Sequence, residues 1–164
     1  MVPIISVVGP SKADKTLLVE RLISELEKRG YRVATVKRDA HNHDLDTPGK
    51  TSWRHSQAGA ESVIVSAPEK ITMFKKVAKE WALDEIAKKF LSDSDIVITD
   101  GFTNEKKPKI KVLLSQAEED SQVPSDELFS IVGGKNSEKS VPKFNLEEIE
   151  KLADLIEEKF LKKR

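Results

Sequence analysis

The octapeptide GPSKADKT, at residues 9–16, is the stretch of this sequence best suited to chemistry. It places Gly9, Lys15 and Thr16 at the defining positions of the phosphate-binding pattern G-x-x-x-x-G-K-[ST]. In such a loop the backbone N–H groups surround the phosphates, the lysine contacts the terminal phosphates, and the hydroxyl binds magnesium. We therefore expect a nucleotide site in which Lys15 and Thr16 take these two roles.

Asp14 stands where that pattern has its second glycine. A glycine is usual there because the backbone passes close to the phosphates, often with dihedral angles that a Cβ penalises. A carboxylate about 4 Å from a phosphate would cost on the order of 4 kcal/mol at an effective dielectric of about 20. We expect weak triphosphate binding and slow or absent turnover, with Lys12 folding over Asp14 or the phosphates and offsetting part of the loss.

The alternative interpretation of this octapeptide is an ordinary turn between a strand and a helix. The apolar, β-branched run IISVV precedes Gly9, and a pattern typical of an amphipathic helix follows, with Leu18, Leu22 and Leu26 on one stripe. This context is the one in which phosphate-binding loops occur. We therefore favour descent from a phosphate-binding loop.

A second candidate is Asp100, the last residue of the expected strand IVITD. Ligands gather at the carboxyl edge of parallel sheets, where a carboxylate can hold magnesium or its water. An aspartate before a glycine is also a plain turn signal. Together with Lys15 and Thr16, Asp100 predicts a magnesium-nucleotide site.

The third candidate is the polar segment RDAHNHDLD within a long loop at residues 38–51. Its two histidines and three aspartates could gather around a metal ion, although their spacing matches no tight zinc pattern. The residues concerned are Asp39, His41, His43, Asp44 and Asp46. A solvated polar loop is the alternative, and we favour one aspartate, Asp46, meeting the nucleotide or its magnesium.

Strands and helices alternate along the chain, which predicts an α/β protein with a mostly parallel sheet. Expected strands cover residues 4–8, 32–37, 62–66, 71–74, 96–100, 109–114 and 128–132, the third and fourth as an antiparallel pair. Expected helices run from Lys15 to a stop at Gly30 and over residues 52–58, 83–91 and 146–160.

The composition suggests one domain, residues 1–164, in the cytoplasm. The 28 basic and 28 acidic residues balance, so no net charge attracts nucleic acid or an anionic membrane. Cysteine is absent, which excludes disulfides, thiolate metal sites and cysteine nucleophiles.

Taken together, these segments resemble the molybdopterin-guanine dinucleotide biosynthesis protein B (MobB) family, small P-loop proteins that assist attachment of GMP to the molybdenum cofactor. The resemblance extends from Ile4 to about Val112 and is most specific in VATVKRDAHNHDLDTPGKTSWRHSQAGAESVIVSA. DIVITDGFTNEKKPKIKVL is similar to a later family signature, which usually has Glu where this chain has Asp100. The family loop is ordinarily G-x-S-G-S-G-K-T, so Lys12 and Asp14 replace two of its glycines.

The resemblance implies a three-layer P-loop NTPase-like fold, GTP and Mg²⁺ as cofactors, at most weak GTPase activity, and no assigned catalytic residue. It also implies a homodimer, with molybdopterin and the molybdenum cofactor guanylyltransferase as partners. Magnesium would be held by Thr16, Asp100 and Asp46. The nucleotide-binding loop would comprise Gly9, Ser11, Lys12, Ala13, Asp14, Lys15 and Thr16.

Two other functions are compatible with the sequence. A small-molecule P-loop kinase needs a second basic pocket, which Arg38, Lys50 and Arg54 could furnish, and a lid that excludes water. A non-enzymatic adaptor would keep the loop only as an inherited scaffold. No guanine-reading Asn-Lys-x-Asp stretch is visible, so the sequence does not choose between GTP and ATP.

Overall fold

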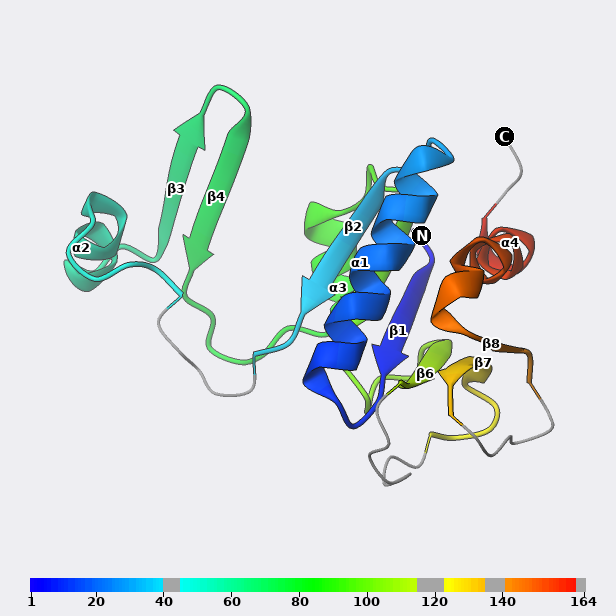
Figure 1. Ribbon diagram of the computed structural model, residues 1–164. Helices are drawn as coiled ribbons and strands as arrows, with labels where there is room; N and C mark the ends of the chain where they lie inside the picture. The colour runs from blue at the N-terminus through cyan, green and yellow to red at the C-terminus, as the bar shows by residue number, and fades with distance from the viewer. Residues whose placement is uncertain (40–44, 115–122, 135–140, 162–164) are drawn as a thin grey trace. The chain divides into compact units, whose positions relative to one another are not determined.

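A six-stranded parallel sheet is the framework of the fold (Figure 1). The computed structural model describes residues 1–39, 45–114, 123–134 and 141–161. The strands of this sheet are β1 (Ile4–Val8), β2 (Val33–Lys37), β5 (Ile96–Asp100), β6 (Lys109–Leu113), β7 (Leu128–Gly133) and β8 (Lys143–Phe144). Their spatial order is β2-β5-β1-β6-β7-β8, and each neighbouring pair is parallel.

The central strands are buried because helices cover both faces of the sheet. All five residues of β1 and of β6 are buried, as are the first four of β5. β1 and β5 carry near-continuous apolar or β-branched runs, as expected for a parallel sheet with two covered faces, whereas β6 includes the buried residues Lys109 and Lys111.

Two helices pack on one face of the sheet and a third packs on the other (Figure 1). The first face carries α1 (Lys12–Lys28) and α4 (Ile149–Phe160), the latter preceded by the 3₁₀ turn η1 (Leu146–Glu148). The opposite face carries α3 (Leu83–Phe90), whose Leu83 and Ala87 join Ile4 and Val97 in a smaller core. The expected three-layer α/β architecture with a mostly parallel sheet is confirmed.

Residues 39–82 form a second compact unit, which is described by itself. It contains the short helix α2 (Thr51–Gln57) and an antiparallel hairpin of β3 (Ser62–Ala67) and β4 (Lys70–Lys75). The sequence predicted this antiparallel pair. The remaining chain, residues 1–38 and 83–164, forms the first unit, so the expectation of a single domain over residues 1–164 stays a prediction.

Two differences from the expected elements stand out. Helix α1 begins at Lys12, before the predicted start at Lys15, because Ser11 caps its first turn. Strand β8 was not predicted, since two residues are too few to show a period of two. Within the part of the chain that the structure describes, no helix is long and apolar enough to cross a membrane.

Candidate functional site

Two of the candidates from the sequence, the GPSKADKT loop and Asp100, lie at the carboxyl edge of the parallel sheet. Asp100 ends β5 and lies opposite Val7 of β1 on one side and Lys37 of β2 on the other. The GPSKADKT loop leaves the same edge directly after Val8, the last residue of β1. The fold therefore brings Asp100 and the loop to neighbouring strand ends, as parallel pairing requires.

Asp100 is a largely buried carboxylate beside a cation. Its side chain is 14% exposed, and its Oδ2 lies 4.0 Å from Nζ of Lys37. The turn that follows is unusual, because Gly101 has φ of +100° and Phe102, although not a glycine, has φ of +60°. Such left-handed backbone persists only where its surroundings hold it, and it is frequent at functional sites. Burial of the Phe102 ring against α3 supplies that restraint.

Gly9 is required by a close approach between two strands. A Cβ on Gly9 would lie 2.4 Å from the carbonyl oxygen of Val112 in β6. A backbone oxygen at that distance cannot move aside without displacing the strand. The first glycine of the motif is therefore explained by packing against β6, whatever the loop binds.

The segment after Gly9 is a capped helix start. Ser11 is the N-cap of α1, and its Oγ accepts a hydrogen bond from the Asp14 backbone N–H at 3.1 Å. The Ser11 carbonyl oxygen accepts from the Lys15 backbone N–H at 3.2 Å. Two amides of the expected phosphate loop thus have partners within the chain, and Pro10 has no N–H to offer.

The Lys15 ammonium lies over the carbonyl groups of its own loop. Its Nζ donates to the Gly9 carbonyl at 2.8 Å and to the Ser11 carbonyl at 3.2 Å. An ammonium has three N–H donors, so these contacts leave room for a further acceptor. Of the other expected loop residues, Lys12 and Ala13 are exposed in the first turn of α1, and Thr16 is half-buried.

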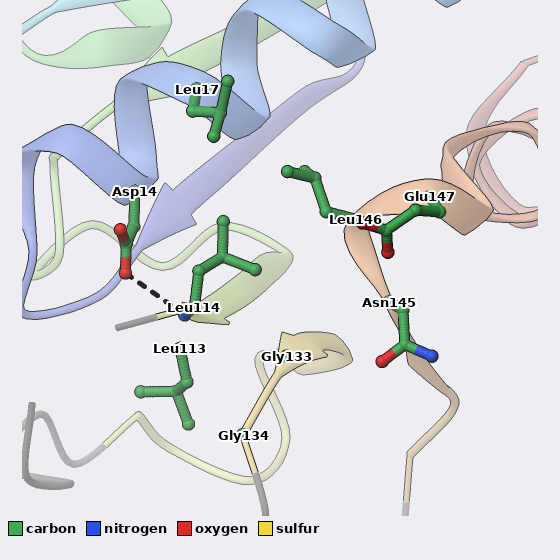
Figure 2. A pocket seen from close by; sticks show the side chains of 9 residues that line it. All are labelled: Asp14, Leu17, Leu113, Leu114, Gly133, Gly134, Asn145, Leu146 and Glu147. Carbon is green, nitrogen blue, oxygen red and sulfur yellow. Dashed lines mark hydrogen bonds between the residues drawn. The ribbon is translucent and has the colours of Figure 1, made fainter. Parts of the chain in front are cut away.

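Asp14 makes a contact that the sequence did not predict. Its Oδ2 accepts a hydrogen bond from the backbone N–H of Leu114, just past the end of β6, at 3.1 Å (Figure 2). The two residues are 100 positions apart in the chain. The bond joins the start of α1 to β6, and a backbone donor partly compensates the charge of the carboxylate.

A pocket adjoins this contact (Figure 2). Its volume is about 540 Å³, and it lies between the first two turns of α1, the ends of β6 and β7, and η1. Its lining residues are Asp14, Leu17, Leu113, Leu114, Gly133, Gly134, Asn145, Leu146 and Glu147. The described lining mixes leucine side chains with the carboxylates of Asp14 and Glu147, and the ammonium of Lys143 donates to the carbonyl oxygen of Gly134.

The remaining candidates belong to the second unit or lie outside the described residues. Asp46 holds the start of its own turn, since its Oδ1 accepts from the Thr47 backbone N–H at 2.8 Å. Its meeting with Thr16 and Asp100 stays a prediction, because it belongs to the other unit. His41 and His43 fall outside the described residues.

The basic residues considered for a kinase pocket are divided between the two units. Arg38 closes the first segment of the first unit, whereas Lys50 and Arg54 belong to α2 and its cap in the second. Their meeting in one basic pocket stays a prediction, because the two units are described separately. Among the described residues, no three or more His, Cys, Asp or Glu side chains gather into a group that could hold a metal ion.

The sheet order, the strand-to-helix segment with Lys15 and Thr16, and the acid ending the neighbouring strand define an α/β protein with a P-loop NTPase-like fold. The model of the family described as Molybdopterin guanine dinucleotide synthesis protein B (MobB) matches residues 4–134. The chain belongs to this family.

Relatives from bacteria resemble it over most of its length. The molybdopterin-guanine dinucleotide biosynthesis adapter protein of Haemophilus influenzae is 32% identical over 159 residues, covering 95% of this chain and 88% of that protein. A crystal structure of molybdopterin-guanine biosynthesis protein B has 31% identity and a TM-score of 0.73, covering 93% of this chain and 95% of that one. Bacillus subtilis MobB, at 21% identity, shares the fold with a TM-score of 0.79, covering 98% and 99%.

Proposed function

We propose that this chain is an accessory protein of molybdopterin-guanine dinucleotide biosynthesis that acts on the molybdenum cofactor guanylyltransferase and its molybdopterin substrate. The observation that carries the proposal is the family match over residues 4–134, together with similarity to the Haemophilus influenzae adapter protein along 95% of the chain. A site is inferred from its own residues and not from the fold alone. The parallel sheet edge supports a role in which GTP and magnesium take part.

The oxygen donors at that edge suit magnesium. Thr16 offers a hydroxyl and Asp100 a carboxylate, and Mg²⁺ in proteins takes a few hard oxygen ligands while retaining waters and substrate phosphates. Asp46 would add a carboxylate or a bound water from the second unit. When bound, magnesium would neutralise phosphate charge. Lys15 would contact the terminal phosphates through the third N–H of its ammonium group, which the two loop carbonyls do not use.

The capped loop supports weak GTP binding with at most slow hydrolysis. A triphosphate needs loop amides that now bond Ser11, and it would lie beside the Asp14 carboxylate. Opening the first turn of α1 would cost those bonds, each contributing about 1 kcal/mol. The structure therefore favours an adaptor whose work does not depend on hydrolysis over an efficient GTPase.

The hairpin of the second unit supports the expected homodimer. Opposed residues Ile64 and Met73 share one face of the β3–β4 pair, as do Ser66 and Ile71. The side chains of Ile64 and Ile71 are 63% and 72% exposed. A lone two-stranded hairpin is marginally stable in water, and an exposed apolar patch marks an interaction surface. A second copy of the chain would cover this face.

The direct test measures guanylyltransferase activity. The purified enzyme, molybdopterin and magnesium-GTP are incubated with and without this protein, and dinucleotide formation is followed. We expect a higher rate or yield with the protein, and co-elution of the two proteins on size exclusion. No change in rate together with no co-elution would contradict the accessory role.

Lys15→Ala separates the adaptor function from one that depends on nucleotide bound by this chain. An adaptor that does not use its loop retains stimulation of the guanylyltransferase in this variant. A protein that must hold GTP loses it. Lys28→Ala, an exposed charge change in the last turn of the same helix, is the matched control.

The oligomeric state is tested by Ile64→Lys combined with Ile71→Lys. Sedimentation velocity should show a dimer for the native chain and a monomer for this variant, because two ammonium groups would be placed in an apolar interface. Val77→Lys, at another exposed apolar residue of the same unit, is the control. A native chain that stays monomeric at high concentration would contradict the dimer.

A further inference from the structure

We propose that Thr99 is a positioning residue, whose hydroxyl group holds the turn after Asp100 and so sets the direction of the Asp100 carboxylate. This proposal rests on the proposed function, in which Asp100 is a ligand of the magnesium ion that accompanies GTP. Thr99 is fully buried, so it would touch neither the ion nor the nucleotide. It acts only through the backbone on either side of Asp100.

Two hydroxyl groups meet inside the sheet directly before this turn. Ser6 of β1 and Thr99 of β5 are paired in register, and both residues are fully buried. Because side chains two positions apart share a face of a strand, the pair lies on the same face as Ile4 and Val97 of the smaller apolar core. A hydroxyl in such surroundings costs free energy unless it is hydrogen-bonded. The partners of this pair therefore matter for the structure.

The hydrogen-bonding capacity of the groups fixes which of them donates. Thr99 Oγ1 lies 2.9 Å from Ser6 Oγ and 3.2 Å from the Gly101 carbonyl oxygen. A carbonyl oxygen can only accept, and a hydroxyl has one proton to donate. Both contacts are hydrogen bonds when Thr99 donates to Gly101 and Ser6 donates to Thr99. The resulting chain of bonds runs from the centre of β1 to the turn.

The Thr99 bond completes a set of restraints around Asp100. The Asp100 carbonyl accepts from the Arg38 backbone N–H at 3.3 Å, and the Gly101 N–H donates to the Val7 carbonyl at 3.3 Å. Thr99 then holds the Gly101 carbonyl, which is the next polar group along the chain. Successive backbone groups after the Asp100 Cα are thereby fixed, and the direction of its side chain is fixed with them.

The turn needs this restraint because its backbone is left-handed at two successive residues. Gly101 has φ of +100° and Phe102 has φ of +60°. A glycine is free to leave that region, and a residue with a side chain is strained in it. The buried Phe102 ring anchors the far end of the turn, whereas the Thr99 hydroxyl fixes the plane of the peptide between the two residues. Magnesium demands near-ideal geometry at about 2.0–2.1 Å, so a ligand on a loose turn binds it poorly.

The test is calorimetric titration of the full chain with magnesium-GTP and with GTP in EDTA. The difference between the two affinities is the gain that magnesium confers. Thr99→Val keeps the branched shape of the side chain and removes the hydroxyl. We expect it to weaken binding of magnesium-GTP by about tenfold, as loss of a group that orients a metal ligand typically does. Binding of GTP in EDTA should match that of the native chain.

Further variants separate positioning from packing. Thr99→Ser and Thr99→Ala form a second pair that differs only in the hydroxyl, and the gain from magnesium should persist in the first and fall in the second. Ser6→Ala leaves Thr99 able to donate to Gly101, so it should lose stability and keep the gain. Ser130→Ala is the control, because it removes another buried hydroxyl, one that donates to the Pro142 carbonyl at 3.2 Å.

The outcomes distinguish this proposal from the proposed function. An unchanged gain in Thr99→Val and Thr99→Ala, in a native chain that responds to magnesium, would overturn the positioning role alone. An equal loss in Ser130→Ala would overturn it as well, since general loosening would then explain the effect. A native chain whose affinity for GTP does not depend on magnesium would overturn both this proposal and the metal site. The accessory role is judged separately, by the guanylyltransferase assay.

Discussion

The bond between Asp14 and the Leu114 amide should be measurable as stability. In Asp14→Asn the side chain keeps its shape and can still accept a hydrogen bond, but the charge is lost. A hydrogen bond to a charged group contributes about 1.5–3 kcal/mol and one to a neutral group about 0.5–1.5 kcal/mol, so the bond weakens by about 1 kcal/mol. A negative charge in the first turn of α1 contributes a further 0.3–1 kcal/mol or so through the helix dipole.

The expected decrease in unfolding free energy is therefore about 1–2 kcal/mol. For a chain of 164 residues this corresponds to a Tm lower by about 3–6 °C. Urea unfolding followed by circular dichroism measures the free energy, and hydrogen exchange reports on the Leu114 amide itself. Glu20→Gln, an exposed charge change on the same helix, should stay within about 0.5 kcal/mol of the native chain. Native stability combined with unchanged exchange at Leu114 would refute the reasoning.

Three further predictions concern the scaffold around the site. Gly9→Ala should lower the unfolding free energy by at least about 2 kcal/mol in urea titrations, because its Cβ would lie 2.4 Å from the Val112 carbonyl; native stability would refute the packing argument. Lys109→Ala should cost about 3–5 kcal/mol by the same assay, since the lysine side chain is fully buried and pairs with Glu127; a cost below about 1 kcal/mol would contradict this. The pKa of Glu148 is lowered by its hydrogen bonds from a neighbouring lysine and from a backbone N–H, so its stabilisation is present above the ordinary glutamate pKa and lost as pH falls through the lowered value. Glu148→Gln should therefore lose stability at neutral pH and show a flatter decline below about pH 4, and identical pH profiles for the two proteins would show that the group contributes nothing.

The central part of the fold could be predicted from the sequence because local signals agreed with one another. The run IISVV is followed by a glycine and the run IVITD ends in an aspartate. Both runs are buried parallel strands. Parallel pairing then places Asp100 beside the loop that follows β1, with no information on long-range contacts required. The leucine stripe of α1 and the closing helix α4 likewise follow from a period of 3.6 residues.

Contacts across long separations could not be predicted in this way. The partner of Asp14 lies 100 positions away, and nothing in GPSKADKT indicates it. Lys109 begins a predicted strand, yet its complete burial depends on Glu127 and on carbonyl groups of the preceding turn. The left-handed backbone at Phe102 is equally invisible, because the residue type disfavours it and the packed ring holds it.

Calorimetric titration of magnesium-GTP into the native chain and into Asp14→Gly tests most directly whether the altered loop limits triphosphate binding. The glycine removes the carboxylate and the tie to Leu114, and it restores the backbone freedom of the family loop. We predict that the variant binds magnesium-GTP at least about tenfold more tightly, which corresponds to about 1.4 kcal/mol of relieved repulsion. Equal affinity in the two proteins would contradict the account, because the Asp14 charge and the capped helix start would then place no limit on the nucleotide.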